Sequence, residues 1–160
     1  MVMRILLLSV HVLGSIIFIG PVTVATSLFP RYARATLAGD DRARGVLDLL
    51  HRVSRNYAVL GLSVPVFGIA IGAALGVLLQ PWLMASMALT TLAAVLLAVV
   101  LIPGQSSVIE TLDDVASPRP ELTPVLARLG LLAGIFALTW TVVVVLMIAR
   151  PGSTTALLNQ

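Results

Sequence analysis

Four long stretches of the chain consist almost entirely of apolar residues, and polar connections separate them. A helix needs about 20 mainly apolar residues to cross a bilayer, and each stretch meets that length. None of them contains Asp, Glu or Lys, and Arg128 is their only arginine. The pattern therefore predicts four transmembrane helices, at residues 5–28, 57–79, 82–102 and 125–148.

The connections predict how these helices are arranged. Only Gln80 and Pro81 separate the second and third spans, so the two must form an antiparallel hairpin, and we expect the bundle to be built around it. The other connections, residues 29–56 and 103–124, are longer and polar. The predicted fold class is all-α. A single polytopic membrane domain, residues 1–160, forms a four-helix bundle with short amphipathic cytoplasmic helices.

Both long connections contain helical patterns of their own. From Asp41 to Asn56, apolar residues recur at helical spacing among arginines, and Asp40 or Asp41 is a suitable N-cap. We expect this segment to lie at the interface, with its apolar side in acyl chains and its arginines among phosphates, and to continue into the second span. Ser107 and Glu110 fit a capping box, which predicts a short helix from Ser107 to about residue 116.

Composition agrees with a chain that is solvated by lipid. Hydrophobic residues make up 59% of it and charged residues 11%, whereas soluble domains carry about 25% charged residues. The net charge of +3 comes from ten arginines without lysine, which is too little to suggest nucleic acid. Arginine without lysine also suggests a high-GC genome, such as that of an actinobacterium. Without cysteine, thiolate catalysis and Cys-ligated metals are excluded.

The arginines gather on one side of the predicted bundle. Eight, including Arg119, lie in or beside the two long connections, against two on the opposite side. The positive-inside rule then places the long connections in the cytoplasm and both termini outside the plasma (inner) membrane. Six arginines should either pair with Glu110, Asp113 and Asp114 or contact anionic lipid. They are Arg31, Arg34, Arg42, Arg44, Arg52 and Arg55.

Glycines recur at helical spacing in the second and fourth spans. Lipid provides no hydrophobic force between helices, and glycine lets two backbones approach closely. We expect these glycines to serve helix packing within the monomer, a partner-subunit interface or a lipid-facing groove: Gly61, Gly68, Gly72, Gly76, Gly130 and Gly134. Gly20-Pro21 and Pro65 predict kinks in the first and second spans.

His11 lies roughly 9 Å into the first span, at 1.5 Å per residue. A polar side chain at that depth is a candidate functional residue. It could hydrogen-bond to a neighbouring helix, handle protons, or ligate haem b. As a haem ligand it would be level with Met87 of the third span, which would make a His–Met pair of the kind found in some cytochromes.

Several segments resemble a family of predicted integral membrane proteins of unknown function, known mainly from actinobacteria. They are His11–Gly14, Gly20–Thr23, Leu49–Tyr57 and Pro65–Gly68. The resemblance covers essentially the whole chain and implies four membrane helices without an established activity. In His11 and Pro30-Arg31 the chain is also similar to HemJ-type protoporphyrinogen oxidases and to the membrane domain of CopD proteins. The HemJ-type pattern includes a lysine in a later helix, which this chain lacks.

Three functions agree with these patterns. The first is an accessory or scaffold subunit of a larger respiratory or lipid-transporting assembly, without catalysis of its own, with membrane lipids and other membrane proteins as partners. The second is a haem-binding redox protein centred on His11. The third is a small transporter of an apolar or lipid substrate, since moving ions or polar solutes usually needs charges inside the membrane.

Overall fold

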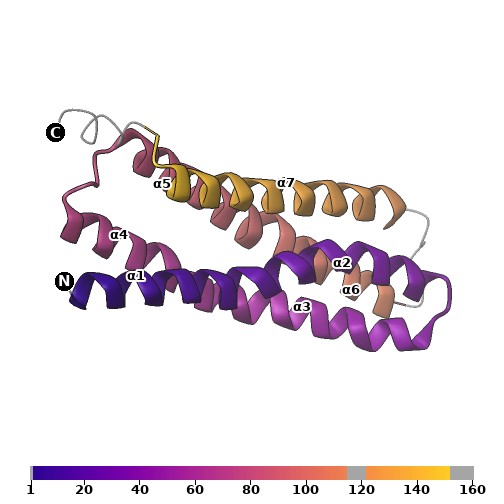
Figure 1. Cartoon of the computed structure of the whole chain (residues 1–160). Coiled ribbons are helices and arrows are strands. Elements are labelled where there is room, and N and C mark those ends of the chain that lie inside the picture. Colours follow the sequence, from indigo (N-terminus) through magenta and orange to yellow (C-terminus); the bar gives the residue numbers. More distant parts are fainter. Residues whose placement is uncertain (1, 115–121, 152–160) are drawn as a thin grey trace.

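The computed structural model of the chain describes residues 2–114 and 122–151, which form four long helical rods (Figure 1). Residues 115–121, including Arg119, lie outside the described residues. The first rod contains α1 (Val2–Gly14), the π-helix η1 (Ser15–Ile19) and α2 (Gly20–Leu37). The second contains α3 (Asp41–Gly61) and α4 (Ser63–Leu75). The third contains α5 (Pro81–Val95), the π-helix η2 (Leu96–Leu101) and α6 (Ile102–Asp113), and the fourth is α7 (Leu122–Ala149).

Each rod is long and apolar enough to cross a membrane, so the predicted all-α architecture with four spans is confirmed. The start of α1, the connection between α4 and α5, and the end of α7 lie together (Figure 1). We call this the terminal end. The connection between α2 and α3, residues 38–40, lies at the opposite end together with the end of α6. We call that the arginine end, because Arg34, Arg42 and Arg44 flank this connection.

At the arginine end the helices continue beyond the expected spans. The first rod remains helical to Leu37, and the third continues without a break through Ser107 to Asp113. The prediction that Ser107 opens a helix is therefore wrong: Ser107 is inside one, and its carbonyl oxygen accepts the Thr111 hydroxyl at 2.8 Å. Asp40 does cap α3, because its carboxylate accepts the backbone N–H groups of the second and third residues that follow it.

The amphipathic first part of α3 packs against protein. Leu47 is fully buried and Leu50 nearly so, and both belong to the hydrophobic core. The prediction that this apolar face lies in acyl chains at the interface is therefore wrong. The physical reason is that α2 also extends past the expected span and offers α3 an apolar partner along its length. The amphipathic segments are thus extensions of the rods and not separate short helices.

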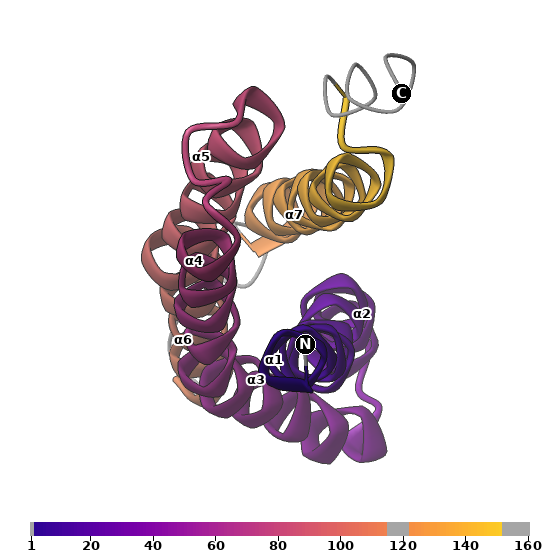
Figure 2. The same cartoon turned by 60° about the vertical axis from the view of Figure 1, so that its left-hand side comes forward.

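The core occupies the half of the bundle nearer the arginine end. There α2 packs against α3 and α7, and α5 and η2 also pack against α7. Toward the terminal end the rods separate into two pairs, α1 with α4 and α5 with α7 (Figure 2), and few contacts join the pairs. The bundle is thus built around α2, α3 and α7. The expectation that it is built around the α4–α5 hairpin is wrong, since these antiparallel helices scarcely touch.

Prolines explain the interruptions in three rods. Each π-helix ends two residues before a proline: η1 ends at Ile19, before Gly20-Pro21, and η2 ends at Leu101, before Ile102-Pro103. A proline ring lacks an N–H and needs room in the preceding turn, and the wider π turn provides that room. In the second rod, Pro65 cannot donate to the Gly61 carbonyl oxygen, and the helix is interrupted at Leu62.

Candidate functional site

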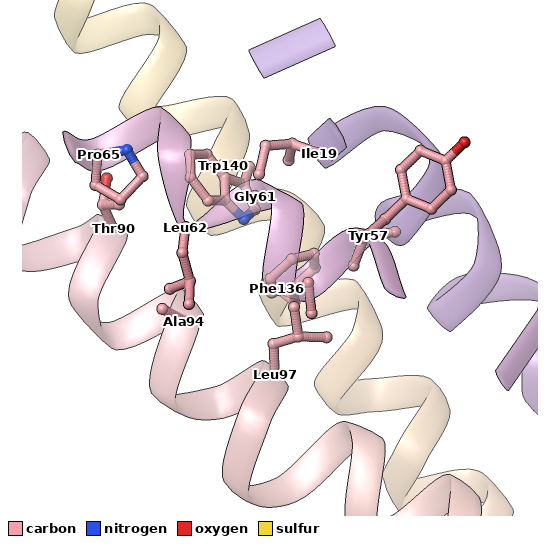
Figure 3. A pocket seen from close by; sticks show the side chains of 12 residues that line it. Ile19, Tyr57, Gly61, Leu62, Pro65, Thr90, Ala94, Leu97, Phe136 and Trp140 are labelled. Carbon is pink, nitrogen blue, oxygen red and sulfur yellow. The ribbon is translucent and has the colours of Figure 1, made fainter. Parts of the chain in front are cut away.

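A cleft lies where the two helix pairs begin to separate (Figure 3). It is narrow, with a cavity volume of about 40 Å³, and it is partly open to the outside. Segments of all four rods line it: Ile19 and Val22; Tyr57, Ala58, Gly61, Leu62 and Pro65; Thr90, Ala94 and Leu97; and Phe136 and Trp140. The break before Pro65 therefore shapes one wall.

The lining side chains are mostly apolar, and they differ in exposure. Phe136 is 1% exposed and belongs to the core, whereas Leu62 is 57% exposed. Leu62 extends toward Ala94, and the Tyr57 hydroxyl points away from the cleft (Figure 3). We therefore place the floor of the cleft at Phe136 and its mouth at Leu62, between α4 and α5.

Trp140 places one polar group in this apolar surrounding. Its indole Nε1 is buried and has no hydrogen-bond partner among the described residues. The hydroxyls of Thr139 and Thr141 donate to carbonyl oxygens of their own helix, at 2.8 and 3.0 Å, and neither accepts from the indole. The ring packs edge-on against Phe136, with centroids 6.3 Å apart. An unpaired N–H in an apolar environment is unfavourable, so a ligand that brings an acceptor would gain from it.

His11 lies outside this cleft and joins α1 to α4. The residue is 8% exposed, and its Nδ1 is 2.9 Å from the Val64 carbonyl oxygen. That bond requires the tautomer in which Nδ1 carries the proton and donates. A Cβ at position 68 would lie 3.0 Å from Cε1 of the ring, so Gly68 makes the space that the imidazole occupies. His11 is the only buried residue among the described side chains of α1.

One side of the His11 ring is engaged by α4, because Nδ1 contacts the Val64 carbonyl oxygen. The edge of the ring from Nδ1 through Cε1 to Nε2 lies against Gly68 of α4. Haem ligation through Nε2 stays a prediction. Met87 is on α5, 37% exposed, and α4 lies between α1 and α5 in both views (Figures 1 and 2). The expected level pair of His11 and Met87 is therefore not formed.

The glycines on the second and fourth rods contact different neighbours. A Cβ built on Gly61 would lie 3.4 Å from Ile19, and one built on Gly130 would lie 3.8 Å from Pro30. A Cβ built on Gly72 would lie 2.9 Å from each of two leucine side chains. Gly76 instead ends α4 in the left-handed conformation, with φ +66°, which glycine adopts without strain. Its Cβ position and that of Gly134 are open.

Of the six predicted arginines, Arg44 makes the expected contact between the two connections. One guanidinium nitrogen lies 2.9 Å from an Asp113 carboxylate oxygen and 3.3 Å from Asp48. This pair joins α3 to α6. The other five arginines are exposed: Arg31, Arg34, Arg42, Arg52 and Arg55. Within the described residues, no three acidic, histidine or cysteine side chains come together as a metal site.

A polar cluster between α3 and α6 was not predicted. Gln105 is 1% exposed; its carbonyl oxygen accepts from His51 Nδ1 at 3.2 Å, and its amide donates to Ser54 at 3.3 Å. The Ser106 hydroxyl lies 3.4 Å from His51 Nε2. His51 and Ser54 are three residues apart on an amphipathic helix, and this spacing was the available sequence signal. Their partner is more than 50 residues away, which the spacing could not reveal.

The family described as "Predicted integral membrane protein (DUF2269)" matches residues 5–151, which include segments of all four rods. The chain belongs to this family. The predicted family resemblance is thereby confirmed, whereas the similarity to HemJ-type and CopD proteins stays a prediction. No curated protein and no solved structure matches the chain. The DUF2269 description names membrane insertion and no activity, so a function must be argued from the cleft.

Proposed function

We propose that this DUF2269 protein binds an apolar, lipid-class molecule between its spans and carries or presents it without catalysis. The observation that supports this most is the cleft, since residues from all four rods line it with apolar side chains. Pockets for small molecules are concave and mainly apolar, with a few polar groups that fix orientation. The unpaired indole N–H of Trp140 is such a group.

The chemistry of the cleft favours this ligand class. An ion or polar solute would need charged or multiple polar partners at this depth, and the cleft lining contains no charged side chain. An apolar chain loses no hydrogen bonds on entering, and it fills space that would otherwise lack packing contacts. With Leu62 exposed at the mouth, a chain could enter sideways from the bilayer.

The test is native mass spectrometry of protein purified in mild detergent, with one variant that fills the cleft. Ala94 lines the cleft, so Ala94→Leu narrows it; Ala98 is exposed four residues later, so Ala98→Leu is the matched control. We expect co-purified lipid on the wild type and on Ala98→Leu, and its loss from Ala94→Leu. Equal lipid on all three proteins would contradict the proposal.

We also propose a second role, as an accessory subunit that contacts another membrane protein through α1. The supporting observation is that His11 alone is buried among the described side chains of Val2–Gly14, while Ile5, Leu6 and Leu13 are each more than half exposed. A photoreactive residue at Leu13 should then crosslink to a protein in the native membrane, whereas one at Leu131 of α7 should not. Crosslinks to lipid alone from both positions would exclude this role.

In both roles we propose that the arginine end faces the cytoplasm and the terminal end the outside of the plasma membrane, following the positive-inside rule. Cysteine labelling in intact cells tests this orientation, because the chain has no native cysteine. A cysteine at Gly39 should be protected from an impermeant reagent, and one at Leu79 should react. The reverse pattern would invert the topology.

A further inference from the structure

Charged residues of both signs gather at the arginine end, where Arg34 and Arg42 are exposed beside the connection of residues 38–40. Exposed acidic groups lie near the tip, at Asp41 beside the start of α3 and at Glu110 and Asp113 near the end of α6. Arg44 is held among them by Asp113 and Asp48. Arg55 lies 14 residues after Asp41 on the same helix, about 21 Å nearer the terminal end at 1.5 Å per residue.

Arg55 has no carboxylate partner within the described residues. It is exposed, and the ion pairs found there all involve Arg44. Arg55 comes just before the apolar part of a rod long enough to cross a membrane, so it would lie near lipid phosphates, where cationic side chains attract anionic headgroups. Arginine can also bind a phosphate through two parallel hydrogen bonds. This residue is therefore suited to hold the headgroup of an acidic lipid.

Arg55 is also aligned with the mouth of the cleft. Leu62 follows it by seven residues, which is two helical turns, so both lie on the same side of the rod. Between them, Ala58 and Gly61 contribute to the cleft wall. A molecule whose phosphate contacts Arg55 would thus direct its chains along this side, toward the exposed Leu62.

We propose that the occupant of the cleft is an anionic phospholipid, with its phosphate on Arg55 and an acyl chain entering beside Leu62. This inference rests on the proposed lipid-binding function and adds the headgroup to it. The charge of Arg55 and the apolar lining are each complementary to one part of such a molecule. A zwitterionic phospholipid offers the same chain and no net negative charge, so it is the proper comparison.

The experiment measures how brominated acyl chains quench Trp140. Trp82→Phe leaves Trp140 as the single tryptophan, since the chain has two. The protein is reconstituted into phosphatidylcholine vesicles that contain a small fraction of brominated lipid, either phosphatidylglycerol or phosphatidylcholine. We expect phosphatidylglycerol to quench at about fivefold lower mole fraction, which corresponds to the roughly 1 kcal/mol that one arginine contributes at a membrane surface.

Three further variants in this background separate the possible results. Arg55→Gln should remove the preference for phosphatidylglycerol, and Arg31→Gln, an exposed arginine on α2, should keep it. Ala94→Leu should reduce quenching by both lipids. Equal quenching by both lipids in the parent protein would overturn the headgroup assignment and leave the lipid-binding function standing. Quenching that Ala94→Leu does not reduce would overturn the lipid-binding function itself.

Discussion

The imidazole of His11 occupies the space that a side chain at position 68 would fill. Its Cε1 is 3.0 Å from the Cβ position of Gly68, and its Nδ1 donates to the carbonyl oxygen of Val64. The histidine and the glycine are thus complementary, and together they fix how α1 lies on α4. Hydrogen bonds between membrane helices contribute about 0.6 kcal/mol on average, so this one should have a measurable effect.

Gly68→Ala should therefore lower the free energy of unfolding by about 1 kcal/mol, because the ring must move and its hydrogen bond weakens. His11→Ala should have a similar effect. The double variant should cost little more than either single one, since both remove the same contact. Unfolding in detergent titrated with SDS measures all three. Gly134→Ala is the control, because its Cβ position is open; additive losses would show that the residues act separately.

The contact of α6 with α7 depends on a small residue in the same way. A Cβ on Gly104 would lie 2.7 Å from a methyl group of Leu129, which is 5% exposed and belongs to the core. Gly104→Ala should cost about 1–3 kcal/mol of stability, as overpacking does. Leu129→Ala in the same chain should recover part of that loss. Thermal melts in detergent measure both variants. If Leu129→Ala recovers none of the loss, the loss does not come from contact between position 104 and Leu129.

The buried amide of Gln105 should contribute measurably to the stability of the bundle, although it lies near the tip. Gln105→Ala leaves both His51 and Ser54 without their partner, and an unsatisfied buried group costs about 1–3 kcal/mol. Ser107→Ala, an exposed residue on the same helix, should change stability by less than about 0.5 kcal/mol. Chemical unfolding of the two variants compares them directly. Equal stability would show that the amide contributes nothing net.

Exchanging the charges of Arg44 and Asp113 should show how much this ion pair contributes to stability. Asp113→Arg places two arginines together and should lower stability by up to about 1 kcal/mol, the range of partly exposed pairs. Adding Arg44→Asp should restore much of it, while Glu110→Arg, at an exposed position, should have little effect. The difference should shrink as salt is raised. A loss that is independent of salt would exclude an electrostatic origin.

Sequence patterns were sufficient for the fold class because its determinants are local. Long apolar stretches predict spans, Asp40 is a good N-cap, and Pro21 and Pro65 mark interruptions that the structure contains. The end of α6 was harder to predict. Ser107 and Glu110 fit a capping box, but no break precedes them, because Pro103 is accommodated by η2 and the helix continues.

The candidate site depends on distant contacts that local patterns do not encode. Glycine spacing suggested helix contacts and left the neighbours unnamed: a Cβ on Gly68 would meet His11, whereas one on the equally spaced Gly134 would meet no described atom within 4 Å. The depth of His11 suggested haem, and only the position of α4 shows that its Nδ1 is engaged by the Val64 carbonyl oxygen. The cleft forms because two helix pairs separate, and that separation is a property of the whole bundle.

The π-helix η1 also sets the phase of α1 relative to the rest of its rod. A π turn accommodates one residue more than an α turn, and each residue of an α-helix advances the side chain by about 100°, at 3.6 residues per turn. Deleting one residue within Ser15–Ile19 would let the rod become regular and would rotate α1 by about that angle. His11 would then face lipid instead of α4. The extra residue therefore sets the rotation of α1 about its axis, so that His11 faces Gly68 of α4.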